Sequence, residues 1–183
     1  MDRLKDKVAI VTGSTSGIGT GIAKMFGAEG ARVVVCGRNE ERGAAVVDAI
    51  AEVGGTAWFH KLDITQPETV DALFADTKEH WGSIDVLVNN AGYEQIQPFT
   101  EVTPEAYDHI MAVNMKGVFF MAQEVAKVMK EHGGGKIINI GSLGSYIGLE
   151  ESSVYCSTKG GVIQLSKTMA IELGPYHIQV NCL

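Results

Sequence analysis

Positive charge is scarce in this sequence and is not clustered. The 183 residues include 15 lysines and arginines against 22 aspartates and glutamates, which gives a formal net charge of -7 at pH 7. The basic residues form no continuous run. Because affinity for nucleic acid comes mainly from clustered lysine and arginine, this composition argues against a general nucleic-acid binder, and we expect no nucleic-acid partner.

Cysteine is also rare. Cys36, Cys156 and Cys182 are far apart and form no CxxC pair, a pattern typical of reduced thiols and not of a disulfide or zinc framework, so we expect no metal site. No apolar stretch is long enough to span a bilayer, and the charged start MDRLKDK lacks the apolar segment of a signal peptide. We therefore expect a cytoplasmic protein with no membrane partner.

Short apolar runs, in contrast, are plentiful. With 45% hydrophobic residues, the chain can bury one sizeable core, so we expect a single domain over residues 1–183. Runs rich in β-branched residues predict strands at 7–12, 31–36, 56–62, 84–89, 136–142 and 177–181. Helical patterns separate these strands. Strict alternation of this kind predicts an α/β fold with an open parallel sheet covered on both faces.

Three of the helices carry specific expectations. In the helix at 40–53, the predicted apolar face consists of Ala44, Val47, Ile50 and Ala51. Residues 65–68, of sequence TQPE, predict a capping box at the start of the next helix. A long helix should run from Thr103 to about Glu131, with a bend or a subunit contact as explanations of its length. In this helix the polar Asn114 falls on the inward stripe, where a buried amide needs partners.

A glycine-rich turn follows the first strand. The sequence TGSTSGIG at residues 12–19 places Gly13, Gly17 and Gly19 where strand becomes helix. Such a turn lets backbone N–H groups and a helix N-terminus face a pyrophosphate, so this order of elements favours dinucleotide binding. The spacing is G-x-x-x-G-x-G and not the common G-x-G-x-x-G.

The end of the second strand bears on the choice of cofactor. An acidic residue there suits the ribose 2′-hydroxyl of NAD, whereas an arginine suits the 2′-phosphate of NADP. The sequence reads Gly37-Arg38-Asn39, which favours NADP and leaves NAD possible. The alternative is that Arg38 is simply a solvated charge at the start of the next helix.

Two further segments have open interpretations. Asn89-Asn90-Ala91-Gly92 ends the fourth strand, where it would either line a cofactor crevice or form an ordinary turn. Ser142 stands at the end of the fifth strand, and the loop that follows at 143–152 would form part of a substrate pocket or a surface loop.

Tyr155 and Lys159 are four residues apart in a helical pattern, so both project from one face. A fixed positive charge beside a phenol favours the phenolate and allows acid/base chemistry. The pair also occurs by chance on amphipathic helices, with a half-buried tyrosine and a solvated lysine. Cys156, which lies between them in sequence, is expected to be a packing residue.

Taken together, the TGSTSGIG turn, the NNAG tetrapeptide, Asn114, Ser142 and the YCSTK segment resemble the short-chain dehydrogenase/reductase family, in its order and spacing and over essentially the whole chain. The resemblance implies a doubly wound Rossmann sheet ordered 3-2-1-4-5-6. It also implies NAD(P)-dependent conversion between a secondary alcohol and a carbonyl, and a homodimer or homotetramer.

The same resemblance assigns roles to residues. Tyr155 would be the acid/base, Lys159 would bind the nicotinamide ribose and favour the phenolate, Ser142 would bind the substrate oxygen, and Asn114 would hold a proton-relay water. The cofactor would be bound by Gly13, Ser16, Gly17, Ile18, Gly19, Arg38, Asp63, Ile64, Asn90, Ala91 and Gly92, together with Tyr155 and Lys159. Candidates for substrate contact are Tyr93, Glu94, Gln95, Tyr146, Leu149 and Glu150.

The sequence departs from the family pattern in two places. Ser16 stands where NADP-preferring relatives often have a basic residue, so Arg38 would recognise the phosphate alone. The family pattern also continues past the sixth strand, so we expect a truncated product or a partial sequence, with the C-terminal part missing. The alternatives to an active oxidoreductase are therefore a nucleotide-binding protein without turnover and a structural fragment. Within the enzyme hypothesis, 3-oxoacyl reduction, polyol oxidation and general ketone reduction are not separable.

Overall fold

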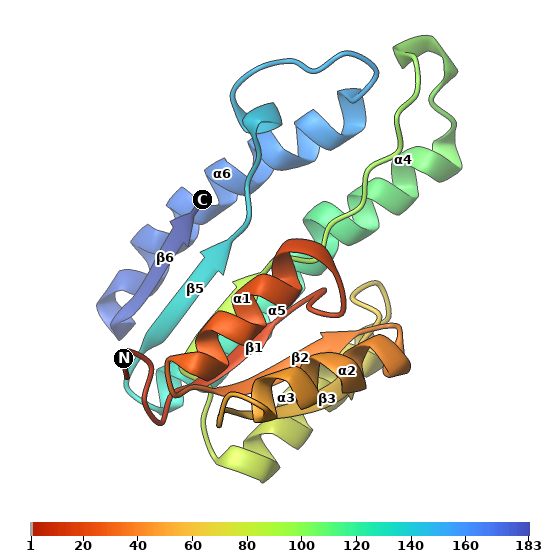
Figure 1. Ribbon diagram of the computed structural model, residues 1–183. Helices are drawn as coiled ribbons and strands as arrows, with labels where there is room; N and C mark the ends of the chain where they lie inside the picture. Colours follow the sequence, from red (N-terminus) through yellow and green to blue (C-terminus); the bar gives the residue numbers. More distant parts are fainter. Residues whose placement is uncertain (1) are drawn as a thin grey trace.

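The computed structural model describes residues 2–183 as strands alternating with helices (Figure 1). The strands are β1 (Val8–Val11), β2 (Arg32–Gly37), β3 (Thr56–Lys61), β4 (Val86–Asn89), β5 (Gly135–Asn139) and β6 (Ile178–Cys182). The α-helices are α1 (Gly17–Ala28), α2 (Glu40–Ala51), α3 (Pro67–Trp81), α4 (Pro104–Met111), α5 (Val118–Glu131) and α6 (Ser153–Leu173). Short helical segments are η1 (Phe99–Glu101), η2 (Ala112–Gly117), η3 (Leu143–Ser145) and η4 (Gly174–Tyr176).

All six strands are parallel and lie in the order β3-β2-β1-β4-β5-β6, which confirms the predicted doubly wound sheet. Val11 of β1 pairs with Val35 of β2 on one side and with Val88 of β4 on the other. The chain order reverses between β1 and β4. The loops that leave these two strands therefore diverge and open a crevice at their carboxyl ends.

Alternating side chains of the central strands enter two separate cores, one on each face of the sheet. Ile10, Val34 and Leu87 pack against α3 and α5 on one face. Ala9, Val33 and Val88 pack against α1 and α2 on the other. Because both faces are covered, the central strands are apolar at almost every position, which is why they are readily recognised in the sequence.

The predicted apolar face of α2 is correct at Ile50 and in part at Val47, which packs on the core, and wrong at the two alanines. In α2 the buried residues are Gly43, Val46 and Ile50, whereas Ala44 and Ala51 are exposed. Gly43 lies under the ring of Phe59, and this contact requires glycine at that position. The inward face of α2 is thus rotated by about one residue from the predicted one.

The capping box predicted at 65–68 does not form. The N-cap of α3 is Gln66, whose side chain makes no capping hydrogen bond. The Thr65 hydroxyl instead donates to Asp63 Oδ1 at 2.7 Å. Because α3 begins at Pro67 with Gln66 as its N-cap, Thr65 lies one residue before the position from which a capping box is made.

The long helix predicted from Thr103 to Glu131 is interrupted by a π-helical turn. Thr103 caps α4 as expected, with its hydroxyl accepting the Ala106 N–H at 3.2 Å. The chain then passes through η2, a π-helical segment, before α5 begins at Val118. Asn114 lies within this segment and is 1% exposed, so the predicted inward position of its amide is confirmed. Single π-turns inside α-helices are frequent at functional sites.

Helix α6 runs alongside β5 and β6 and lies on the same face of the sheet as α3 and α5 (Figure 1). Among residues 2–183, no helix combines the length and apolarity needed to cross a membrane.

Candidate active site

The glycine turn and the NNAG segment are joined by hydrogen bonds at the β1–β4 crevice. The Thr12 hydroxyl oxygen accepts the N–H groups of Asn90 at 3.0 Å and Ala91 at 2.9 Å. The Asn90 side chain donates in return to the Thr12 carbonyl at 2.8 Å. Asn90 therefore braces the turn, which excludes the reading of NNAG as an isolated surface turn.

Glycine is required at Gly13 of this turn. The residue has a φ of +66°, and a Cβ there would lie 2.9 Å from the Ala91 Cα. Gly17 has a φ of +55°, and a Cβ would meet nothing within 4 Å. The backbone at the start of α1 is consequently open to a ligand, next to the positive end of the helix dipole.

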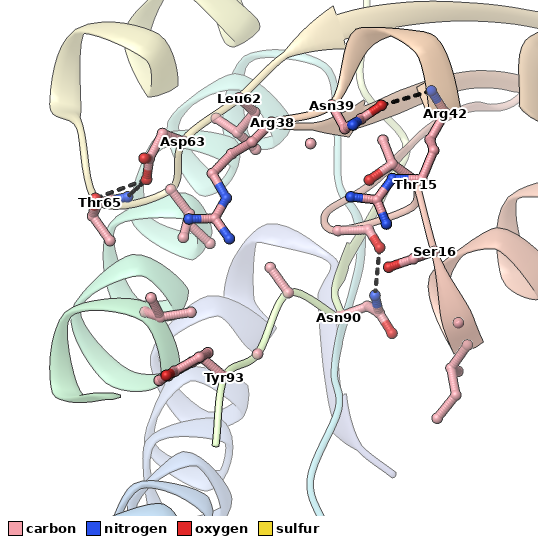
Figure 2. Close-up of a pocket in the computed structure, with 18 of the residues that line it drawn as sticks. Thr15, Ser16, Arg38, Asn39, Arg42, Leu62, Asp63, Thr65, Asn90 and Tyr93 are labelled. Carbon is pink, nitrogen blue, oxygen red and sulfur yellow. Dashed lines mark hydrogen bonds between the residues drawn. The ribbon is translucent and has the colours of Figure 1, made fainter. Parts of the chain in front are cut away.

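A pocket of about 390 Å³ opens above this turn (Figure 2). Of the residues predicted to bind a cofactor through the turn, β2 and the loops, all except Gly19 line it: Gly13, Ser16, Gly17, Ile18, Arg38, Asp63, Ile64, Asn90, Ala91 and Gly92. Gly19 is buried beneath the turn, where a Cβ would meet Asn90 Nδ2 and the Gly13 carbonyl oxygen.

The pocket is also lined by residues that were not predicted to bind the cofactor: Thr15, Gly37, Asn39, Arg42, Leu62, Thr65, Tyr93, His109 and Val113. Tyr93 and His109 pack edge to face, with ring centroids 4.7 Å apart. His109 comes from α4, which no local motif connects with the crevice. Arg42 comes from the first turn of α2, which no local motif connects with the crevice either.

Asp63 is held in its ionised form. Partial burial alone would raise the pKa of the Asp63 carboxyl group. Hydrogen bonds from the Thr65 hydroxyl and N–H groups and the nearby Arg38 charge act in the opposite direction. Together they hold the Asp63 pKa below its usual value, so this side of the pocket carries one fixed negative charge beside the Arg38 guanidinium.

Tyr155 and Lys159 lie one turn apart on α6, as predicted from their spacing. The Lys159 Nζ atom is 5.6 Å from the centroid of the Tyr155 ring. Lys159 is only 6% exposed and donates to the Ile140 carbonyl at 2.7 Å. Burial lowers the Lys159 pKa from its ordinary value, against a smaller opposing effect of Cys182. The lysine is therefore not the solvated surface charge of the chance interpretation.

Ser142 caps the short helix η3 and is tied to α6. Its Oγ accepts the Gly144 N–H at 3.1 Å, which leaves the hydroxyl hydrogen free to donate elsewhere. The Ser142 N–H donates to Ser145 Oγ at 3.1 Å, and that hydroxyl donates to the Lys159 carbonyl at 3.0 Å. Ser145, which the sequence did not single out, thus connects the backbone of Ser142 with that of Lys159.

Asn114 connects the π-turn with the NNAG loop and with α6. Its Oδ1 accepts the Tyr93 N–H at 2.8 Å, and its Nδ2 donates to the Tyr93 carbonyl at 2.7 Å and to Thr158 Oγ1 at 3.3 Å. A Cβ at Gly92 would lie 3.7 Å from Asn114 Oδ1 and 3.8 Å from Lys159 Nζ. The three segments converge at Gly92, which joins the pocket to the Tyr155–Lys159 pair.

The predicted substrate contacts are less closely grouped. Tyr93 lines the pocket, whereas Glu94, Gln95, Tyr146 and Glu150 are exposed and Leu149 is half-buried. The two loops that carry them touch, because the Gln97 N–H donates to the Glu151 carbonyl at 2.8 Å. The loop at 143–152 is therefore held against the loop that follows the NNAG segment. In the part of the chain that the structure describes, no group of three metal-ligating side chains is present.

The fold and the pocket define a dinucleotide-binding α/β protein, and comparisons with known proteins agree. Residues 7–183 match the short chain dehydrogenase family. The chain is 41% identical to a sorbitol dehydrogenase from Cereibacter sphaeroides over 99% of this chain and 70% of that protein. It is 38% identical to a 3beta-hydroxysteroid dehydrogenase from Mediterraneibacter gnavus over 100% of this chain and 66% of that protein.

The same agreement holds for solved structures. The crystal structure of a gluconate 5-dehydrogenase from Burkholderia cenocepacia, in complex with NADP and tartrate, has a TM-score of 0.93 and 37% identity, with 98% of this chain and 71% of that chain covered. This chain belongs to the short-chain dehydrogenase family and is an NAD(P)-dependent oxidoreductase.

Proposed function

We propose that this protein interconverts a secondary alcohol and a carbonyl compound with NADP as its preferred cofactor and Tyr155 as the acid/base. The observation that carries the proposal is the buried Lys159 ammonium group, 5.6 Å from the Tyr155 ring and next to the inner end of the pocket. Burying a cation costs stability even with the hydrogen bond to the Ile140 carbonyl, and at this position the charge can favour the phenolate form of the tyrosine.

The residues present fit a dinucleotide. The open backbone at Gly17 and the start of α1 suit a pyrophosphate, and Arg38 with Arg42 supplies positive charge near the end of β2. Gly92 gives room beside Lys159 for the nicotinamide ribose. A bound nicotinamide would accept or supply the hydride, which is chemistry that no side chain here can perform.

The protein's own residues would manage the proton and the charge on oxygen. In oxidation, the substrate hydroxyl loses its proton to the Tyr155 phenolate, and in reduction the phenol returns a proton to the same oxygen. Ser142 donates a hydrogen bond to this oxygen. Its Oγ accepts the Gly144 N–H, and its hydroxyl hydrogen is available for the substrate. Lys159 binds the ribose and stabilises the phenolate, and Asn114 keeps the Gly92 segment beside Lys159 and takes part in the proton relay.

For the substrate we favour a polyhydroxylated alcohol over a 3-oxoacyl thioester. The loops at the substrate side carry Glu94, Gln95 and Glu150, all exposed and without a neighbouring lysine or arginine in sequence. Carboxylate and amide groups can accept hydrogen bonds from several hydroxyl groups, whereas the two carboxylates would repel the phosphate of a carrier that bears a 3-oxoacyl thioester. The names of the sorbitol and gluconate dehydrogenases are consistent with this choice, and the name of the steroid dehydrogenase supplies the competing substrate class.

The test is a turnover assay monitored by nicotinamide absorbance, with NADP and NAD for a panel of C4 to C6 polyols and hydroxysteroids and with NADPH and NADH for 3-oxoacyl thioesters. We expect NADP-linked oxidation of at least one polyol. Nucleotide binding without turnover across the whole panel would instead support a binding protein that does not catalyse. Absence of both binding and turnover would contradict the proposal entirely.

A further inference from the structure

Arg42 occupies a position in the pocket that its place in the sequence does not reveal. It is the third residue of α2, and its N–H donates to the Asn39 side chain at 2.8 Å. This cap fixes the first turn of α2 directly after β2. Figure 2 shows the Arg42 side chain extending from α2 toward the glycine turn, with its guanidinium group beside Thr15 and Ser16.

Arg38 reaches the same pocket from the end of β2, close to Asp63 (Figure 2). Among the ion pairs between residues 2–183, none involves Arg38 or Arg42. The charge of Arg38 is partly balanced by the Asp63 carboxylate, whereas no carboxylate lines the pocket beside Thr15 and Ser16. Arg42 is thus the less compensated of the two cations.

The acidic residues next to Arg42 in sequence do not neutralise this site. Glu40 binds Lys61, with its Oε1 2.7 Å from the lysine Nζ, and neither Glu40 nor Glu41 lines the pocket. An acid directed at a ribose 2′-hydroxyl, as NAD selection requires, is therefore absent from this end of the pocket in the described residues. The groups at this end of the pocket that can bind an anion are the guanidinium groups of Arg38 and Arg42, the Ser16 hydroxyl and the first turn of α1.

We propose that Arg42 is a second ligand of the 2′-phosphate of NADP and supplies, from α2, the positive charge that the glycine turn lacks at Ser16. The inference rests on the proposed NADP-dependent function and names a residue that sets its cofactor selectivity. A phosphate monoester carries close to two negative charges at neutral pH, which the two guanidinium groups match in number and in hydrogen-bond geometry. The 2′-hydroxyl of NAD would leave Arg42 without an anionic partner and Arg38 with only the Asp63 carboxylate nearby.

The test measures binding, so it does not depend on turnover. The dissociation constants of NADP, NAD, adenosine 2′,5′-bisphosphate and AMP are determined by calorimetry for wild type, Arg38→Ala, Arg42→Ala and the double variant. We expect Arg42→Ala to weaken NADP and the bisphosphate by about 10-fold or more, with NAD and AMP changed by less than about 3-fold. The double variant should no longer prefer NADP.

Two further variants test the geometry of the Arg42 contact and the specificity of the effect. Arg42→Lys keeps the charge but loses the planar fork, so its loss of NADP affinity should be intermediate. Arg32→Ala is the matched control, since Arg32 begins β2 at the opposite end of the sheet and its side chain is 42% exposed. It should bind all four ligands as wild type does.

The outcomes separate the two claims. If wild type prefers NADP and Arg42→Ala keeps that preference, or weakens NADP and NAD equally, the role of Arg42 is wrong while the proposed function stands. If wild type binds neither dinucleotide, or binds NAD better, the NADP-dependent function fails and the Arg42 inference fails with it.

Discussion

At the scale of single residues, the site depends on a lysine that is buried as a cation. Lys159 is 6% exposed, and its hydrogen bond to the Ile140 carbonyl offsets only part of the cost of burial. Its pKa is accordingly lower than the ordinary value of 10.5, mainly because burial disfavours the ammonium form, while Cys182 opposes the shift more weakly. Burial of the Lys159 ammonium group beside Tyr155 therefore lowers the free energy of unfolding.

The lowered pKa predicts how stability changes with pH. The unfolded chain keeps the ordinary lysine value of 10.5, so unfolding takes up a proton between the folded pKa and 10.5. Wild type should therefore gain free energy of unfolding, relative to Lys159→Met, as pH rises through that window toward 10.5. Urea unfolding of both proteins over a pH series measures the difference, and parallel curves would show that Lys159 is not desolvated.

The sequence predicted single residues well where a motif fixes their distance from a strand end. Arg38 directly follows β2, and Gly13 and Gly92 follow β1 and β4, so the sequence placed all three at strand ends, while it left open whether Arg38 and Gly92 face the crevice. Arg42 and His109 could not be placed in this way, because their contribution depends on the rotational phase and direction of helices. Neighbouring residues alone do not specify these quantities.

At the scale of elements, the π-turn at η2 is the feature that joins the separate parts of the site. It directs the Asn114 side chain at both backbone groups of Tyr93 and at Thr158 of α6. Gly117, at the end of the same turn, packs so closely on Ile64 that a Cβ would lie 2.7 Å from its Cγ1. The turn therefore sets the spacing of the Asp63–Ile64 loop, the NNAG loop and α6.

Asn114→Ala tests this coupling. The substitution removes the hydrogen bonds to the Tyr93 backbone and leaves these partly buried groups without their side-chain partner. We expect the free energy of unfolding to fall by about 1–3 kcal/mol and kcat to fall by about 10-fold or more. Urea unfolding and steady-state kinetics provide the two measurements.

Gln123→Ala is the control for that variant, because it truncates an exposed amide on the neighbouring α5. It should change neither quantity appreciably. A stable Asn114→Ala protein with wild-type kcat would show that the π-turn does not organise the site.

Sequence reasoning failed for two elements for identifiable reasons. A π-turn adds one residue to a helical turn without a compositional signal, so the segment from 104 to 131 looked like one helix. Residues 65–68 matched the capping-box pattern, but α3 has Gln66 as its N-cap, and the Thr65 hydroxyl donates to Asp63 instead. The π-turn and the start of α3 both depend on the arrangement of the chain in space, which the local sequence pattern does not specify.

At the scale of the whole molecule, the parallel sheet brings together groups from distant parts of the chain. The glycine turn, Arg38, the NNAG loop, Ser142 and Tyr155 span most of the sequence, yet all follow strands whose carboxyl ends lie at one edge of the sheet. The alternation of apolar strands and helices predicted the α/β class, and the family resemblance implied the strand order that the structure has. The detailed substrate pocket had no comparable signal, because exposed loops carry it.

The central claim is that Tyr155 transfers the proton while the pocket at the β1–β4 crevice binds the cofactor. The measurement that tests it most directly compares kcat and the NADP dissociation constant of wild type and Tyr155→Phe on the polyol oxidised fastest. The account predicts a kcat lower by about 100-fold or more with the dissociation constant within about 3-fold of wild type, since only the phenolic oxygen is removed. A Tyr155→Phe protein that retains wild-type kcat would contradict the account.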